Sequence, residues 1–182
     1  ICGNETGTAT LAQYCIQQDW LLVPIPDDLS YDHASMACCG LGPGFNANRT
    51  MQVMPTDTVL ISGLGPVGLG AAAIALYRGA RVLGLDLNPY RVELAKSMGV
   101  EAVIDPTSDG ALDEIMELTD GKGAAKSVEC SSVETAPNFL VQAAATRGQI
   151  ASPGWGGPMN ARDINRKGLT VHGCWHWNHQ RD

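Results

Sequence analysis

The amino-acid sequence predicts an α/β fold, in which a doubly wound, six-stranded parallel sheet is covered by helices on both faces. From about Thr58 onward, short β-branched runs alternate with helical segments and short polar joints. A glycine-rich turn, residues 63–68, separates the first of these runs from an alanine-rich helix. The composition, 45% hydrophobic with 5% aromatic residues, suits the packed core of such a domain.

The part of the chain before about Ser35 does not join this alternation. We expect a strand at 8–16, a rigid turn at 24–28, and short helices at 32–40 and 44–51. The spacing Gly40-x-Gly42-x-Gly44 imitates a phosphate-binding turn, but no strand precedes it, so we expect a flexible junction there. This part is interpreted as the tail of another domain followed by a connection.

Six strands and four helices are expected in the alternating part. The strands are predicted at 58–62, 81–86, 102–104, 126–130, 148–151 and 169–173. The helices are predicted at 66–77, 89–98, 111–118 and 135–145, with a shorter polar turn at 161–166. Such folds bind ligands at the carboxyl ends of the strands, where the strand order reverses.

The glycine turn has the spacing Gly63-x-Gly65-x-x-Gly68 directly after a strand. Gly63 permits a tight turn, Gly65 lets the backbone approach a pyrophosphate, and Gly68 lets the next helix lie close to the sheet. Pro66 and Val67 begin that helix, where the missing N–H of proline costs nothing. The free N–H groups and positive dipole end of the helix then face the bound phosphates. The sequence therefore predicts a Rossmann domain that binds a dinucleotide.

The second strand ends in an acidic residue about 20 residues beyond these glycines. Asp86 is expected to bind the adenosine ribose hydroxyls and to repel a 2′-phosphate, which favours NAD over NADP. Leu87 follows it, and Arg91 in the next helix is expected to flank the adenine or the ribose, although an arginine can also hold a 2′-phosphate. The alternative interpretation of Asp86 is a simple N-cap of the helix from Pro89.

Charge and cysteine content exclude several classes of partner. A formal net charge of -7 without a basic cluster argues against nucleic acid and against an anionic membrane surface. No stretch is long and apolar enough to span a bilayer. Six cysteines without regular spacing, and no signal peptide, indicate reduced thiols and a cytoplasmic location. The chain begins at Ile1 and stops just after an apolar strand, and we expect it to be a piece of a longer protein.

Several motifs together resemble one enzyme family. They are GTATLAQYC (7–15), LVPIPDDL (22–29), CCGLGPG (38–44), GLGPVG (63–68) and ELAKSMG (93–99) followed by AVID (102–105). Their order resembles the medium-chain dehydrogenase/reductase superfamily, in its zinc-dependent alcohol dehydrogenase branch, over nearly the whole chain. The resemblance implies that residues 1–35 end a GroES-like β catalytic domain and that residues 36–182 form the NAD-binding domain, without its closing C-terminal helices.

The resemblance also implies a zinc ligand. A cysteine followed by Gly-x-x-x-Gly at the domain junction binds the catalytic zinc of the family, and Cys39 with Gly40 and Gly44 matches this pattern. A thiolate suits zinc because it is soft and anionic. Without the resemblance, Cys39 is interpreted as a small buried hydrophobic residue, since the chain contains no CxxC or HExxH spacing. The chain departs from the family at Pro43, where a threonine often packs against the nicotinamide.

Loops after the later strands are further candidate cofactor contacts. By resemblance, Cys130 and Ser131 lie near the adenine and ribose. Ser152, Pro153 and Gly154, together with Cys174, lie near the nicotinamide. Each loop can equally be a turn that caps a helix or ends a strand.

The implied reaction is hydride transfer from an alcohol, polyol or amino alcohol to NAD, with zinc bound to the substrate oxygen as a Lewis acid. The other zinc ligands and the proton relay would lie outside this chain, so the isolated chain is expected to be inactive. The alternatives are a dinucleotide-binding module without catalysis and a zinc-free, quinone reductase-like member of the superfamily. Cys39 argues against the second alternative.

The last strands of the family pair across a two-fold axis, and the resemblance therefore implies a homodimer or homotetramer. Trp175 and Trp177 flank His176 and are expected on one side of a continuing strand, where aromatic residues suit a subunit interface. The alternative is core packing. The spacing His176-x-x-His179 is not interpreted as a metal site, since the rest of a ligand set is absent.

Overall fold

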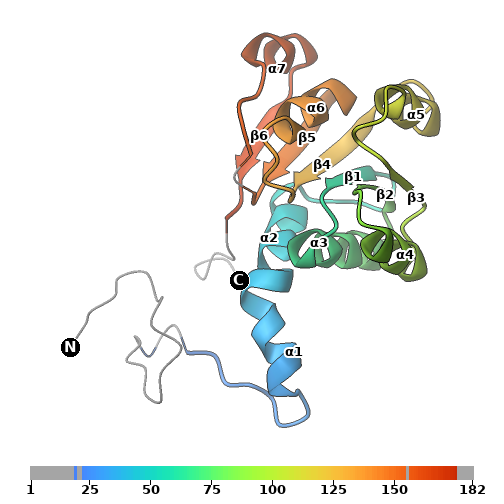
Figure 1. Cartoon of the computed structure of the whole chain (residues 1–182). Helices are drawn as coiled ribbons and strands as arrows, with labels where there is room; N and C mark the ends of the chain where they lie inside the picture. The colour runs from blue at the N-terminus through green and yellow to red at the C-terminus, as the bar shows by residue number, and fades with distance from the viewer. Residues whose placement is uncertain (1–18, 20–21, 155, 176–182) are drawn as a thin grey trace.

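The centre of the molecule is a six-stranded sheet in which every pair of neighbouring strands is parallel. The computed structural model describes residue 19, residues 22–154 and residues 156–175. The strand order is β3-β2-β1-β4-β5-β6, which reverses direction between β1 and β4 (Figure 1). The strands are β1 (Thr58–Ser62), β2 (Arg81–Leu85), β3 (Ala102–Ile104), β4 (Ala124–Glu129), β5 (Ala144–Ser152) and β6 (Thr170–Gly173). The predicted doubly wound Rossmann fold is confirmed.

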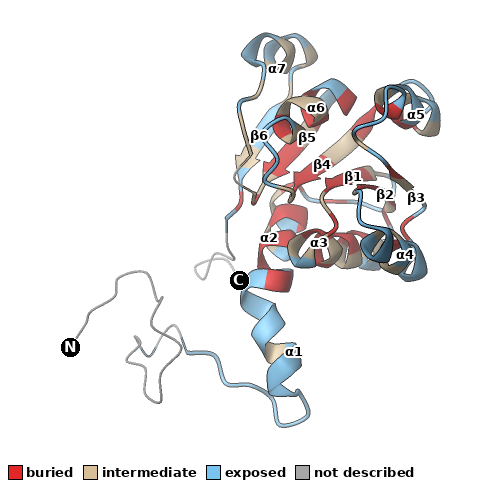
Figure 2. Cartoon of the chain, viewed as in Figure 1, coloured by how far each residue is buried: buried red, intermediate tan, exposed pale blue. Residues whose placement is uncertain are grey.

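Helices cover both faces of this sheet (Figure 1). They are α3 (Pro66–Tyr77), α4 (Pro89–Met98), α5 (Ala111–Leu118), α6 (Ala136–Ala143) and α7 (Ala161–Lys167). Alternate residues of β1 serve two separate cores: Val59 and Ile61 pack with α3, whereas Leu60 packs with α5 and α6. Both faces of β1 are therefore buried (Figure 2), as expected of a central parallel strand.

Most predicted element bounds differ from the observed bounds by one or two residues. The exceptions lie in the second half of the chain. β5 begins at Ala144, so the helix predicted at 135–145 ends at Ala143. The segment predicted as a polar turn at 161–166 is a helix, α7, which Asn160 caps by accepting hydrogen bonds from the N–H groups of Arg162 and Asp163.

The prediction of a flexible glycine junction before the sheet is wrong. One helical run covers α1 (Tyr31–Met36), the π-helical turn η2 (Ala37–Leu41) and α2 (Gly42–Thr50). A Cβ atom on Gly44 would lie 2.5 Å from the backbone nitrogen of Ala71 in α3. A Cβ atom on Gly70 of α3 would lie 2.5 Å from the carbonyl oxygen of Gly40. These glycines therefore let two helices approach each other closely.

The N-terminal segment and the chain end are described only in part. The turn predicted at 24–28 is confirmed, since the N–H of Leu29 donates to the carbonyl of Pro26 at 3.0 Å. The strand predicted at 8–16 and the residues His176, Trp177 and His179 lie outside the described residues. Among the described helices, none has the length and apolar character needed to cross a membrane.

We expect Gly44→Ala to destabilise the fold by about 2 kcal/mol, because the added methyl group meets the backbone of α3 and an overpacked site cannot relax cheaply. The matched control is Gly110→Ala, since nothing lies within 4 Å of a Cβ atom at Gly110. Urea denaturation of both variants measures the difference. Equal stability of the two variants would contradict the close helix contact.

Candidate functional site

The glycine turn joins β1 to α3 at the carboxyl edge of the sheet. Gly63 has a φ of +83°, a conformation that side chains rarely adopt, and its N–H donates to the carbonyl of Leu85 at 2.8 Å. A Cβ atom on Gly68 would overlap the carbonyl oxygen of Gly63. Gly65 is the N-cap of α3 and has open space where a Cβ atom would lie. The start of α3, with its unpaired N–H groups, therefore faces an open site.

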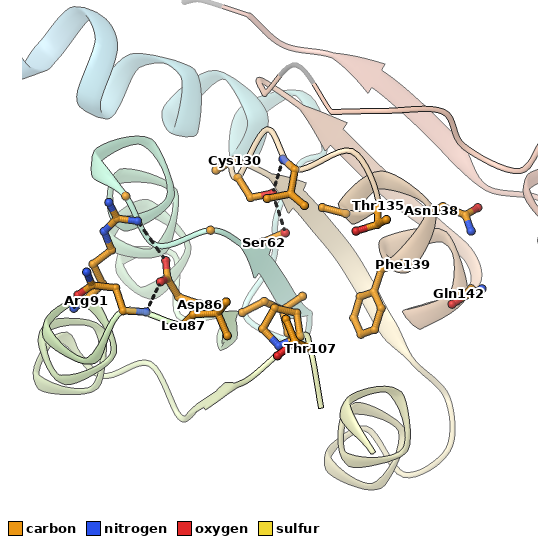
Figure 3. Close-up of a pocket in the computed structure, with 18 residues that line it drawn as sticks. Ser62, Asp86, Leu87, Arg91, Thr107, Cys130, Thr135, Asn138, Phe139 and Gln142 are labelled. Atoms are coloured by element: carbon orange, nitrogen blue, oxygen red, sulfur yellow. Dashed lines mark hydrogen bonds and ion pairs between the residues drawn. The ribbon is translucent and has the colours of Figure 1, made fainter. Parts of the chain in front are cut away.

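Asp86 lies directly after β2 and faces this turn. Its Oδ2 accepts a hydrogen bond from the N–H of Leu64 at 2.7 Å, and its Oδ1 accepts one from the N–H of Asn88 at 2.8 Å. Its side chain is only 7% exposed. Arg91 Nη1 lies 3.7 Å from Oδ2 (Figure 3). The carboxylate is therefore fixed in place beside the glycine turn by two backbone donors.

The N-cap alternative for Asp86 is wrong. Asn88 is the N-cap of α4, and its side chain accepts a hydrogen bond from the N–H of Arg91 at 3.2 Å. Asp86 is therefore not needed to begin this helix.

A cavity of about 790 Å³ opens at the carboxyl edge, between the ends of β1, β2 and β4 (Figure 3). Of the predicted site residues, it is lined by Gly63, Gly65, Asp86, Leu87, Arg91, Cys130 and Ser131. The cavity is also lined by residues that the sequence interpretation missed. Thr107, after β3, lies near Leu87, whereas Asn138, Phe139 and Gln142 on α6 lie across the cavity from Asp86 (Figure 3). Thr107 was open to prediction because it closely follows a strand, whereas the α6 residues carry no comparable local signal.

The remaining predicted residues do not line this cavity. Pro66, Val67 and Gly68 lie within the first turn of α3. Ser152, Pro153 and Gly154 end β5 or follow it, and the hydroxyl of Ser152 donates to the carbonyl of Gly154 at 3.3 Å. Cys174 is 2% exposed and belongs to the core on the α3 side of the sheet, so the structure does not bring it to the cavity.

Glu129, the last residue of β4, is a functional candidate that the sequence interpretation missed. The residue is fully buried, and its Oε1 accepts hydrogen bonds from the N–H and hydroxyl of Ser131 and from the N–H of Ser132. Its neighbour Cys130 lines the cavity. Burial raises the pKa of the Cys130 thiol, and the negative charge of Glu129 raises it further.

Cys39 lies in η2 with an exposed, free thiol, next to the exposed Cys38. In the part of the chain that the structure describes, no three His, Cys, Asp or Glu side chains form a group able to hold a metal ion. The described residues therefore do not fit a zinc centre by themselves, and Cys39 is at most one ligand of it.

We expect iodoacetamide near neutral pH to modify Cys38 and Cys39 well before Cys130 and Cys174. The first two thiols are exposed, whereas burial raises the pKa of the Cys130 and Cys174 thiols, so their thiolates form only at more alkaline pH. Mass spectrometry of the alkylated peptides over time measures the order. Early modification of Cys130 would contradict the described environment of this thiol.

A family model and the curated relatives of this chain point to the same enzyme family. The model of the family described as zinc-binding dehydrogenase matches residues 66–182, which is more than half of the chain. The chain is 33% identical to the L-threonine 3-dehydrogenase of Alteromonas mediterranea, a match that covers 96% of this chain and 53% of the relative. It is 32% identical to the uncharacterized zinc-type alcohol dehydrogenase-like protein YphC of Escherichia coli, covering 90% of this chain and 48% of the relative.

A solved structure agrees with these relatives. The crystal structure of an NAD-dependent alcohol dehydrogenase superimposes with a TM-score of 0.83 at 26% identity, covering 94% of this chain and 52% of that chain. This chain thus spans about half the length of the relatives that it matches.

Proposed function

The chain belongs to the zinc-binding dehydrogenase family, and from this premise we propose that it is the NAD-binding half of an oxidoreductase that transfers hydride between an alcohol, polyol or amino alcohol and NAD. The L-threonine 3-dehydrogenases and the NAD-dependent alcohol dehydrogenase that the chain resembles support this reaction class. The choice among these substrates belongs to the half of the complete protein that this chain does not cover.

The observation that carries the proposal is the Asp86 carboxylate, held beside the glycine turn and at the wall of the cavity. Two ribose hydroxyls can donate to a carboxylate, and this recognition requires an acceptor that is already fixed in position. The open space at Gly65 suits a pyrophosphate against the N-terminus of α3. The residues present therefore fit a dinucleotide.

The negative charge of Asp86 favours NAD over NADP, because a 2′-phosphate bound at this place would meet a buried like charge. Arg91 lies near that carboxylate and offsets part of its charge, but it is nearly half exposed and therefore screened by solvent. Bound NAD supplies the hydride acceptor, while the residues of this chain bind and orient it.

In the complete protein we propose zinc as a second cofactor, with Cys39 as one ligand. The zinc-type name of a relative and the exposed thiol at the predicted position support this assignment. The described residues do not complete a ligand set around Cys39, so the remaining ligands would come from elsewhere in the complete protein.

The domain boundary and the assembly are proposals of the same kind. Residues 1–35 would end a GroES-like catalytic domain, and residues 36–182 would form the cofactor domain. A homodimer or homotetramer would form through β6. This strand lies at the edge of the sheet and has three exposed residues, so its free edge is open to pairing with a strand of a second copy. The free thiols of the four described cysteines agree with a reducing, cytoplasmic location.

We expect Asp86→Asn to weaken NAD binding by about tenfold and to reduce the preference for NAD over NADP, because the amide keeps an acceptor for Leu64 but loses the charge. Asp113→Asn, at an exposed position of α5, is the matched control. Calorimetric titration of each variant with both cofactors gives the ratio. Unchanged affinities for both would refute the assignment of Asp86.

We expect the purified 182-residue chain to bind NAD without oxidising alcohols, polyols or threonine, even with added zinc. The physical reason is that a Lewis-acid zinc needs at least three protein ligands, and the described part of this chain offers Cys39 without a set around it. Formation of NADH is the readout. Appreciable turnover would show that this chain contains the catalytic machinery that we assign to the other half.

A further inference from the structure

We propose that Glu129 is a positioning residue of the dinucleotide site, which holds the loop after β4 against the glycine turn and the loop after β5 against β4. The inference rests on the proposed function, since it concerns the binding of the same dinucleotide. It assigns a role to a buried carboxylate that the hydride-transfer chemistry does not use.

Glu129 is a fully buried acidic residue, which is unusual for a side chain that contributes only to core packing. The residue is 0% exposed, and among the described residues no Lys, Arg or His forms an ion pair with it. Its Oε1 accepts three hydrogen bonds, at 2.7 to 2.9 Å, whereas no described residue donates a hydrogen bond to its buried Oε2. Burying such a charge costs more than burying an apolar side chain of the same size, so stability alone does not favour a glutamate here.

The three bonds to Oε1 fix the loop that begins at Cys130. They come from two consecutive backbone N–H groups and one hydroxyl, and they hold Ser132 at a φ of +57°, which a serine adopts at a cost. Ser131 is placed between Glu129 and the glycine turn: a Cβ atom on Gly63 would lie 2.7 Å from the Cα of Ser131. The hydroxyl of Ser62 also donates to that of Ser131 at 3.4 Å.

Glu129 is therefore connected to the glycine turn through a single residue, Ser131. Ser131 touches Gly63 and lines the cavity, and Glu129 is the residue that determines where Ser131 lies. A change in the carboxylate therefore moves a wall of the cavity without touching the ligand.

The second oxygen of Glu129 faces the loop after β5. The N–H of Gly154 donates to the backbone carbonyl of Glu129 at 2.9 Å, and a Cβ atom on Gly154 would overlap Oε2. Gly156 makes a similar close approach to Pro137, at the start of α6. The glycines of this loop thus allow it to lie directly on the β4–α6 connection, with the Glu129 carboxylate between them.

The first test compares Glu129→Gln and Glu129→Ala by calorimetric titration with NAD and by thermal melting. We expect NAD binding to weaken about threefold in the glutamine variant, which keeps an acceptor without the charge, and about tenfold or more in the alanine variant. Glu134→Gln is the control, because it removes the same charge from an exposed residue of the same loop. Its affinity for NAD should equal that of the unaltered chain.

The second test uses Gly154→Ala in two backgrounds. With Glu129 present, the new methyl group displaces Oε2, and NAD binding should weaken about tenfold. With Glu129→Ala, the overlap with the carboxylate is removed and only a 3.0 Å approach to the backbone carbonyl oxygen of residue 129 remains. The second substitution should then cause a much smaller further loss, which a double-mutant cycle measures as coupling. If Glu129→Ala folds poorly, the glutamine variant of the first test still decides, because its side chain fills the same space as the glutamate without the charge.

A purely structural Glu129 would give a different pattern. Its variants would melt at lower temperature, but the folded protein at low temperature would bind NAD with unchanged affinity, and this result would overturn the inference while leaving the proposed function intact. Absence of NAD binding in the unaltered chain would overturn both.

Discussion

Helix α3 begins so close to the end of β1 that no side chain fits at Gly68, where a Cβ atom would overlap the carbonyl oxygen of Gly63. This approach fixes the start of the helix over the carboxyl edge of the central strand. The register of the sheet does the rest: Ser62 at the end of β1 pairs with Leu85 on one side and with Glu129 on the other. Asp86 and Ser131 consequently flank the glycine turn from the two neighbouring strands.

This arrangement places two carboxylates, Asp86 and Glu129, beside the glycine turn. Among the described residues, backbone N–H groups hold each of them, and no cation lies at hydrogen-bonding distance. Asp86 accepts from Leu64 and remains at the wall of the cavity, where it can meet a ligand. Glu129 accepts from Ser131 and Ser132 beneath the cavity wall. One acid is thus suited to recognition and the other to holding the recognising surface in shape.

Local patterns in the sequence were enough to predict the six strands, the glycine turn and Asp86, because each depends on residues close together in the chain. Contacts between distant residues were not predictable in this way. Gly44 was predicted to lie in a flexible junction because nothing near it in the sequence requires a glycine. The requirement comes from its close contact with Ala71 in another helix. Glu129 resembled an ordinary strand residue, since its role depends on Ser131 and on Gly154 after the next strand. The α6 residues that line the cavity were not predictable from the sequence, because their position depends on the packing of α6 against β4 and β5.

The most direct test of the account is a crystal structure of the chain grown with NAD. The account predicts the adenosine ribose hydroxyls within hydrogen-bonding distance of the Asp86 carboxylate and the pyrophosphate against Gly65 at the start of α3. A dinucleotide bound away from the carboxyl edge, or bound there without contact to Asp86, would contradict the central claim.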